Sequence, residues 1–453
     1  MKVVVVGCTH AGIAAVTQIF KAHPDTEVTI YERNDNVSFL SCGISLYLNG
    51  DVKRLEDMFY ASPEDLEKQG ATVRTQHDVL SVDTKAHQLT AQNMVTKEVF
   101  TDTYDKLIMT TGSYVVVPPL MGIDDSRVLL CKSYEQAKQL YKAAKVHKHI
   151  AIVGGGYVGV ELAEAYADTK HEVTLMQSHD QVLNNYVGPL ISGKITELLK
   201  THGVHVLLNE KVQAFHGNDQ TDNILIETSK GEHKADLAIV STGFMANTGL
   251  LQGQVDMDRH GAILVNEYEQ TSNADVYAAG DACISHFNPA GNDAYIPLAT
   301  NAVRQGALAG MNIFGEVQKD MGTQATSAME LFGYTLATSG LTLNAAKKEG
   351  LDATSVIYEG NYRPSYMPTT DLLTIELVYN RKNRQVLGAQ LFSKHEVSQS
   401  ANAISICIQN KNTIDDLAFV DMLFQPHYDE PFNYLNLVAQ LAIEQERQTN
   451  QVK

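Results

Sequence analysis

A chain of 453 residues is longer than one compact domain, and its length predicts roughly two to four of them. Hydrophobic residues make up 44% of the sequence and charged residues 19%, which excludes disorder as the dominant state. The formal net charge of −18 repels phosphate backbones, so we expect no nucleic-acid partner. A small anionic ligand can still bind locally, at backbone amides and helix N-termini.

The first segments of the chain predict a strand, a turn, a helix and a second strand. Lys2–Val6 is a β-branched run, a helical period follows from Gly12 to about Ala22, and Glu27–Tyr31 predicts the second strand. The polar residues Thr9 and His10 interrupt the apolar run that a signal peptide would need. No other stretch is long and apolar enough to span a membrane, so we expect no membrane association.

The same order of elements occurs a second time. Ile150–Val153 predicts a strand, Val160–Ala167 a helix and Glu172–Met176 another strand. Strands that alternate with helices in this way are typical of α/β proteins. Each of the two openings is followed by a later strand that ends on a polar turn: Tyr104–Met109 before Thr110-Thr111-Gly112, and Ala235–Val240 before Ser241-Thr242-Gly243.

These repeats predict two Rossmann-like dinucleotide-binding domains, one inserted in the other. Residues 1–119 and 247–320 form the first domain, and residues 120–246 form the inserted one. Residues 321–453 form a third, α+β domain. Its expected elements are strands over Leu372–Tyr379 and Val386–Phe392, helices over Val397–Gln409 and Asn433–Glu446, and a frayed tail over Arg447–Lys453.

The first turn carries most of a dinucleotide fingerprint. Gly7 makes the tight turn, Gly12 allows the helix to pack closely on the strand, and Glu32 ends the second strand, where it can accept hydrogen bonds from a ribose. Thr9 stands where the middle glycine is usual, so a plain strand–helix turn is the alternative interpretation.

The second fingerprint is complete and reads Gly154-Gly155-Gly156-Tyr157-Val158-Gly159. Two dinucleotide sites in one chain predict a tightly bound flavin and an exchanging nicotinamide cofactor. We place FAD in the first domain, because the strand that ends on Gly280-Asp281 returns to it. A carboxylate at that turn can hydrogen-bond the ribityl chain of FAD.

Cys42 and His10 are the candidate reactive residues. Cys42 precedes Gly43 and a short apolar segment, Ile44–Leu48, so we expect it at a helix N-terminus, where the pKa of a thiol is lowered. The alternative is a buried structural cysteine, which is the default interpretation for Cys8, Cys131, Cys283 and Cys407. His10 lies inside the phosphate-binding turn, from which it can exchange protons with a nearby cysteine or oxygen species. The five cysteines form no CxxC pair, which disfavours disulfides and predicts a reducing cytoplasm.

Two further segments have less specific signals. Pro297-Leu298-Ala299-Thr300 precedes a helix whose positive end can stabilise an anionic reduced flavin, although a plain capped helix explains the segment equally well. The loop over residues 425–431 holds His, Asp and Glu, but their spacing matches no common metal site, so we predict no metal.

Together these residues resemble the pyridine-nucleotide–disulfide oxidoreductases over essentially the whole chain. Within that family they resemble the single-cysteine branch, which holds water-forming NADH oxidases, NADH peroxidases and coenzyme A–disulfide reductases. The segments SFLSCG around Cys42 and YAAGDA around Asp281 are specific. GCTHAG at the start and FQPHYDEPFNYLN near the end look most like the NADH oxidases of lactic acid bacteria.

The resemblance implies that Cys42 cycles between thiolate and sulfenic acid, assisted by His10. It also implies that Tyr157 covers the flavin face where nicotinamide docks, that Tyr186 and Gly243 touch the nicotinamide cofactor, and that Phe424 reaches the flavin of a partner subunit in a homodimer built by the third domain. The residues that it places against FAD are Ala11, Glu32, Val79, Thr110, Ser113, Lys132, Asp281 and the segment 298–300.

The sequence therefore predicts an FAD-dependent NAD(P)H oxidase that reduces O2 to water with two NAD(P)H. The alternatives are a coenzyme A–disulfide reductase or NADH peroxidase on the same scaffold, or a flavoprotein that carries electrons or senses redox state. After the strand Val173–Met176, Gln177-Ser178-His179 stand where an NADH-specific site would have a carboxylate. Without that charge a 2′-phosphate is not repelled, so we hypothesise that NADH and NADPH are both used. The alternative is a neutral turn with ribose held by backbone groups.

Overall fold

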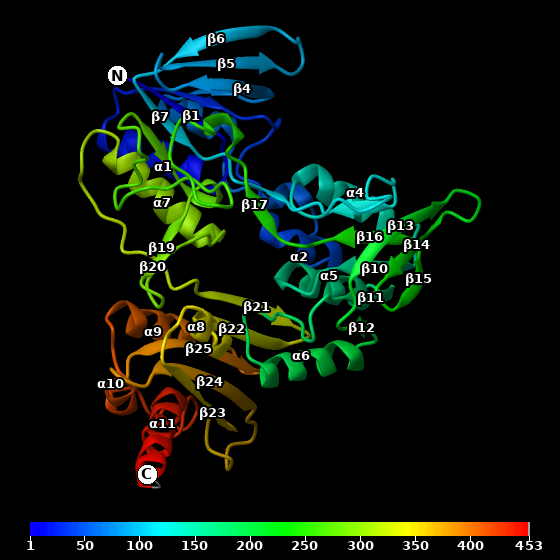
Figure 1. The fold of residues 1–453 in the computed structure, drawn as a ribbon, viewed down its shortest axis with the longest axis vertical. Helices are drawn as coiled ribbons and strands as arrows, with labels where there is room; N and C mark the ends of the chain where they lie inside the picture. The colour runs from blue at the N-terminus through cyan, green and yellow to red at the C-terminus, as the bar shows by residue number, and fades with distance from the viewer. Residues whose placement is uncertain (452–453) are drawn as a thin grey trace.

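The computed structural model describes residues 1–451 and arranges them around three five-stranded sheets (Figure 1). The first sheet lies at the N-terminal end of the molecule, the second lies beside it, and the third is at the C-terminal end. The first two sheets are parallel and the third is antiparallel. In the described part of the chain, no helix is both long and apolar enough to cross a membrane.

The first sheet has the order β18-β7-β1-β2-β3 and is covered on both faces. Val3 and Val5 pack toward helices α1 (His10–Ala22) and α7 (Ala299–Asn312), while Val4 and Val6 pack toward a three-stranded antiparallel sheet. Valine side chains that point alternately to two cores explain why the strand is an unbroken apolar run. The strands are β1 (Lys2–Val6), β2 (Glu27–Tyr31), β3 (Thr72–Arg74), β7 (Lys106–Met109) and β18 (Val276–Ala278), covered by β4 (His77–Asp83), β5 (Gln88–Asn93) and β6 (Val99–Thr103).

The second sheet repeats this design with the order β12-β11-β10-β16-β9. Helix α5 (Tyr157–Asp168) follows β10 (His149–Val153), the central strand of this sheet, through a glycine turn, as α1 follows β1. A second antiparallel sheet covers the other face. The remaining elements are β9 (Val128–Leu130), β11 (Glu172–Met176), β12 (His205–Leu207), β16 (Leu237–Val240), β13 (Val212–Asn218), β14 (Asn223–Thr228), β15 (Gly231–Ala235), α4 (Tyr134–Ala144) and α6 (Pro189–Thr201).

A two-stranded ribbon connects the two parallel units. Strand β8 (Ser113–Val115) carries the chain out of the first unit, and β17 (Phe244–Ala246) carries it back. The two strands are antiparallel and hydrogen-bonded, with Val115 opposite Phe244. The inserted unit therefore begins and ends at neighbouring positions.

The third sheet has the order β21-β22-β25-β24-β23 and is packed by α9 and α11. Helix α11 (Tyr434–Gln451) continues through residues 447–451, so the expected frayed tail is wrong there, because Gln, Glu and Arg sustain a helix where no Gly or Pro ends it. Residues 452–453 lie outside the described part. The other elements are β21 (Ser327–Leu331), β22 (Tyr334–Gly340), β23 (Ala353–Asn361), β24 (Leu372–Asn380), β25 (Val386–Ser393), α8 (Leu343–Lys348), α9 (Ser398–Gln409) and α10 (Ile414–Phe419).

The predicted fold class is confirmed, with one parallel unit inserted in another and an α+β unit after them. The domain boundaries remain predictions. The short connecting elements include the 3-10 turn η1 (Ser41–Gly43), α2 (Ile44–Asn49), η2 (Leu55–Met58), α3 (Pro63–Gln69), η3 (Gly249–Leu251), η4 (Gly280–Ala282) and the hairpin of β19 (Ser285–Phe287) and β20 (Asn292–Ala294).

Candidate functional site

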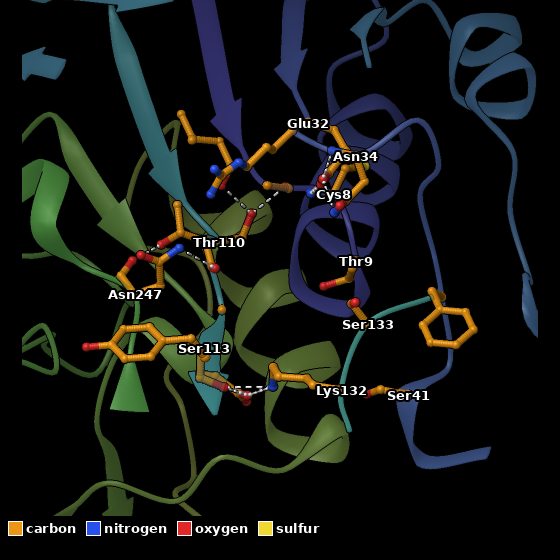
Figure 2. A pocket seen from close by; sticks show the side chains of 18 of the residues that line it. Cys8, Thr9, Glu32, Asn34, Ser41, Thr110, Ser113, Lys132, Ser133 and Asn247 are labelled. Carbon is orange, nitrogen blue, oxygen red and sulfur yellow. Dashed lines mark hydrogen bonds and ion pairs between the residues drawn. The ribbon is translucent and has the colours of Figure 1, made fainter. Parts of the chain in front are cut away.

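A cavity of about 1010 Å³ opens at the carboxyl ends of β1, β2 and β7. This is the edge where ligands bind in open α/β sheets. Figure 2 shows side chains from the first unit and from the start of the inserted one around this cavity. Of the predicted site residues, the cavity gathers Gly7, Thr9, His10, Ala11, Glu32, Val79, Thr110, Gly112, Ser113, Lys132, Gly280 and Asp281.

Close backbone packing forms the turn at the head of the cavity. Gly7 has a φ of 94°, which favours glycine, and a side chain on it would meet the Thr110 carbonyl oxygen at 2.4 Å. A side chain on Gly12 would meet the Gly7 carbonyl oxygen at 2.3 Å. Both glycines are therefore required by the close approach of α1 to the sheet, and Gly12 itself is not part of the cavity wall.

Glu32 lies at the end of β2, as predicted, and is almost fully buried. Its carboxylate accepts hydrogen bonds from the backbone N–H of Cys8 at 2.7 Å and from the backbone and side chain of Asn34 at 2.8 and 2.7 Å (Figure 2). Burial raises the pKa of Glu32, and these donors oppose the rise. Carboxylate oxygens hold about four lone-pair sites, so acceptor capacity remains for ribose hydroxyls.

Lys132 and Ser113 lie across the cavity from Glu32 (Figure 2) and form a hydrogen-bonded group with Asp281. Ser113 donates to the Asp281 carboxylate at 2.6 Å, and the Lys132 ammonium donates to the Ser113 hydroxyl at 2.8 Å. Burial lowers the pKa of Lys132, while Asp281 opposes that shift. The group brings a cation and an anion together from β8, η4 and the segment before α4, which are far apart in the sequence.

Cys42 lies in η1, directly before α2, and keeps an exposed surface. Burial of the rest of the residue raises the pKa of its thiol, and the negative charge of Glu161 adds to the rise. The prediction of a lowered thiol pKa is therefore wrong. Helix α2 has only six residues, and its dipole is opposed by a carboxylate from α5 that no local sequence pattern around Cys42 reveals. Cys42 is not part of the cavity wall.

The other cysteines agree with the structural interpretation. Cys8, Cys131 and Cys283 are buried, and burial raises the pKa of each thiol. Cys407 is half-buried on α9. Only Cys42 is exposed, and all five are free thiols.

The second glycine turn begins α5 and has the same close packing as the first. A side chain on Gly159 would meet the Gly154 carbonyl oxygen at 1.8 Å, whereas Gly156 faces open space. Tyr157, in the first turn of α5, packs edge-on against Tyr186 with 4.4 Å between ring centroids, and its hydroxyl lies 3.1 Å from that of Ser327. Val158 is half-buried beside it, and Gly243 faces open space at the start of β17.

Gln177, Ser178 and His179 follow β11, where the second ribose site is expected. Ser178 and His179 are exposed, but Gln177 is buried and its amide nitrogen donates to the Gln181 carbonyl at 3.3 Å and to Asn184 at 3.1 Å. In this side-chain position the Gln177 amide offers no free donor to a 2′-phosphate, because both amide hydrogens have partners within the protein.

The remaining predicted residues lie elsewhere. Helix α7 begins at Ala299, one residue after its N-cap Leu298, so Ala299 and Thr300 are inside its first turn rather than before it, and none of Pro297–Thr300 is part of the cavity wall. Phe424 is about half exposed in the loop before α11. Cavity residues that the sequence interpretation missed include Asn34, Ser133 and Asn247. Asn34 is two residues from Glu32, but Asn247 reaches the site through its pairing with Gly112, which only the fold reveals.

The donors at the cavity fit a dinucleotide. In the described chain, no side chain caps the N-terminus of α1 or of α5, so the first N–H groups of both helices are available to a pyrophosphate. The cavity volume, the Glu32 carboxylate and the Lys132 group are consistent with FAD at the first site. Among residues 1–451, no group of three or more His, Cys, Asp or Glu is placed to hold a metal ion. Two such helix-end sites and an exposed cysteine define a dinucleotide-dependent oxidoreductase.

Residues 1–306 match the pyridine nucleotide-disulphide oxidoreductase family, and residues 326–435 match the dimerisation domain of the same family. The chain therefore belongs to this family, whose members bind FAD.

The chain is similar to individual family members over its full length. It is 48% identical to an NADH oxidase of Enterococcus faecalis, over 98% of this chain and 100% of that protein. It is 49% identical to a water-forming NADH oxidase of Lactobacillus brevis, solved bound to NADH, with a TM-score of 0.98 over 99% of both chains. An engineered water-forming NADPH oxidase made from that enzyme and solved bound to NADPH is also 49% identical, with a TM-score of 0.98 over 99% of this chain and 100% of that one.

Proposed function

We propose that this protein is an FAD-dependent NAD(P)H oxidase that reduces O2 to water and consumes two NAD(P)H per O2. The observation that carries the proposal is the combination of a full-length likeness to water-forming oxidases with one exposed cysteine beside the dinucleotide cavity. A disulfide reductase with a redox-active cysteine pair is disfavoured, because Cys42 is a free thiol and the other four cysteines are free and less exposed.

The first unit would hold FAD between the N-terminus of α1, Glu32 and the Lys132–Ser113–Asp281 group. The N-terminus of α5 would hold the NAD(P)H pyrophosphate, with Tyr157 and Tyr186 at the nicotinamide. When bound, FAD would accept hydride from NAD(P)H and supply electrons in pairs for the reduction of oxygen and of oxidised Cys42.

Cys42 would carry out the second half of the oxygen reduction, in which hydrogen peroxide is reduced to water. Its sulfur attacks one peroxide oxygen, the S–O bond forms as the O–O bond breaks, and the sulfur becomes a sulfenic acid. His10 accepts the thiol proton and passes it to the departing hydroxide, which leaves as the first water. Two electrons and two protons, with the second NAD(P)H as the electron source, then return the sulfenic acid to the thiol and release the second water. The sum is O2 + 2 NAD(P)H + 2 H⁺ giving 2 H2O + 2 NAD(P)⁺.

The oxidase would act as a homodimer. The matched dimerisation domain carries an apolar surface on α10 and the loop after it, where Phe419, Leu423 and Tyr428 are each about 70% exposed. Large exposed apolar groups of this kind are typical of subunit interfaces. Phe424 lies on the same loop and would contact the partner's flavin. The free thiols favour a reducing compartment such as the cytoplasm.

The test is the ratio of NADH oxidised to O2 consumed, measured with peroxide assayed in parallel and without added disulfide. Two NADH per O2 with no free peroxide supports the proposal. One NADH per O2 with matching peroxide, or no oxygen consumption until peroxide or coenzyme A disulfide is added, would instead identify a peroxide-forming oxidase, a peroxidase or a reductase. Flavin reduction by NADH without turnover on any of these acceptors would favour an electron carrier.

A further inference from the structure

Tyr60 is the hydrogen-bond partner of His10. The tyrosine hydroxyl lies 2.9 Å from His10 Nδ1, and the two rings are parallel to within 1° with centroids 5.5 Å apart. Hydrogen bonding and ring stacking therefore both limit rotation of the imidazole. Tyr60 follows η2, far from the glycine turn that carries His10, and nothing in the local sequence pairs the two residues.

A buried serine holds the two segments together. Ser38 is fully buried, and its hydroxyl accepts hydrogen bonds from the backbone N–H groups of Tyr60 and Ala61 while donating to the Ala61 carbonyl. The backbone N–H of Ser38 donates to the carbonyl of Cys8, two residues before His10. Ser38 has a φ of 66°, which is unusual for a residue other than glycine. Such a conformation persists where surrounding interactions hold it.

The segment that carries Tyr60 also pairs with the segment that carries Cys42. Phe39 and Phe59 form an antiparallel bridge, and the backbone N–H of Leu40 donates to the Met58 carbonyl. Burial raises the pKa of Tyr60 to about 12, and Cys8 and Cys42 contribute to the rise. Tyr60 therefore stays protonated and lies in the electrostatic range of the reactive cysteine.

Two opposite charges of the Lys132–Ser113–Asp281 group influence His10. Burial lowers the pKa of its imidazole, Asp281 opposes this shift and Lys132 adds to it. The imidazole is thus mainly neutral near pH 7 and carries one N–H, so its tautomer decides which nitrogen can accept a proton. A thiol whose own pKa is raised needs such an acceptor, as Cys42 does.

We propose that Tyr60 is a positioning residue that accepts the Nδ1–H of His10 and thereby leaves Nε2 free to take the proton of Cys42. The phenol hydrogen is then directed toward solvent, to which Tyr60 is 47% exposed. Nε2 receives the thiol proton as the sulfur attacks peroxide, and it returns the proton to the hydroxide released when the O–O bond breaks. This inference rests on the proposed function for its reaction, but the hydrogen bond that it invokes can be tested without turnover.

The test removes only the hydroxyl, in Tyr60→Phe, which keeps the ring stack. The first readout is the rate of Cys42 alkylation by iodoacetamide across pH, followed by mass spectrometry of the Cys42 peptide in thiol-reduced holoenzyme under nitrogen. We expect alkylation near pH 7 to slow about three- to tenfold and its midpoint to move to higher pH, the effect of one lost hydrogen bond. Tyr47→Phe, on the neighbouring helix α2, is the matched control and should leave both unchanged.

The second readout is coupling to His10. Tyr60→Phe should raise the peroxide released per NADH oxidised. In a His10→Gln background the same substitution should have no further effect on alkylation or peroxide release. An alkylation profile equal to that of the parent, or an equal effect with and without His10, would overturn the inference. A parent that consumes no O2 would overturn the proposed function instead, and the alkylation profile would still decide the role of Tyr60.

Discussion

Replacing Gln177 by aspartate should shift the cofactor preference of this protein toward NADH. Gln177 follows β11, where a carboxylate would lie beside the ribose hydroxyl that carries the extra phosphate of NADPH. In the native protein the Gln177 amide is engaged by Gln181 and Asn184, so the position offers neither repulsion nor a free donor. We therefore expect the parent to oxidise NADPH with a kcat/KM within about an order of magnitude of that for NADH.

The size of the shift follows from the screening at this site. Two unit charges 4 Å apart interact by about 1 kcal/mol in water and by about 4 kcal/mol near a protein surface. The flanking residues Ser178 and His179 are exposed, so water screens the new charge substantially. We expect a change of roughly 1–3 kcal/mol, which is about a 5- to 150-fold change in the ratio of the two kcat/KM values.

The assay is steady-state oxygen consumption with each cofactor, for the parent, Gln177→Asp and Gln177→Asn. Asparagine has the size of aspartate without its charge, so the difference between the two variants isolates the electrostatic effect from the loss of the Gln181 and Asn184 hydrogen bonds. The reasoning is refuted if the parent has no measurable NADPH oxidation, or if the two variants shift the preference equally.

Three further predictions concern other parts of the molecule. Cys42→Ser should still oxidise NADH but release hydrogen peroxide, since serine forms no sulfenic acid, and a peroxide assay that finds only water would contradict its role. Removal of residues 321–453 should cost the protein its flavin or its fold, and a flavin-replete active monomer in gel filtration would contradict the dimer. Glu269 is fully buried with both carboxylate oxygens unpartnered, and burial raises its pKa well above 4.5. Because the carboxyl pKa is raised in the folded protein, the free energy of unfolding is highest below pH 4.5 and falls as the pH rises. Glu269→Gln should remove this fall and gain roughly 1–3 kcal/mol at pH 7 relative to pH 4, measured by denaturant unfolding at both pH values. Equal pH dependence in parent and variant would show that Glu269 is not responsible.

The two parallel sheets were predictable because their signals are local. A β-branched run, a glycine where the chain turns and a helical period fall within about 30 residues, and Gly7 and Gly154 make the same close contact with a neighbouring strand. The antiparallel sheet of β4, β5 and β6 was missed, because a β-bulge between Val79 and Ser81 breaks the two-residue alternation and leaves the buried Val79 and Val82 three residues apart.

Local sequence patterns did not predict the properties of the site that depend on contacts with other residues of the fold. Burial raises the thiol pKa of Cys42, and Glu161 of the inserted unit adds to the rise, so a rule based on the adjacent helix end gave the wrong sign. The side-chain amide of Gln177 could donate to a phosphate, but in the structure it donates to Gln181 and Asn184 instead. The partner of His10 is Tyr60, and Ser38 is hydrogen-bonded to the segments that carry the two residues.

The paired strands β8 and β17 have a consequence for the order in which the chain folds. Strand β18 must find β7 across the whole inserted sequence, and the entropy of closing so long a loop opposes early pairing. Once the insert has folded and β17 has aligned on β8, the chain returns beside the point where it left the first unit, and only residues 247–275 separate it from β18. Nascent-chain synthesis delivers the segments in that order. The inserted unit should thus shorten the search of β18 for β7, so that the last-made strand of the first sheet pairs only after the insertion that interrupts this sheet has folded.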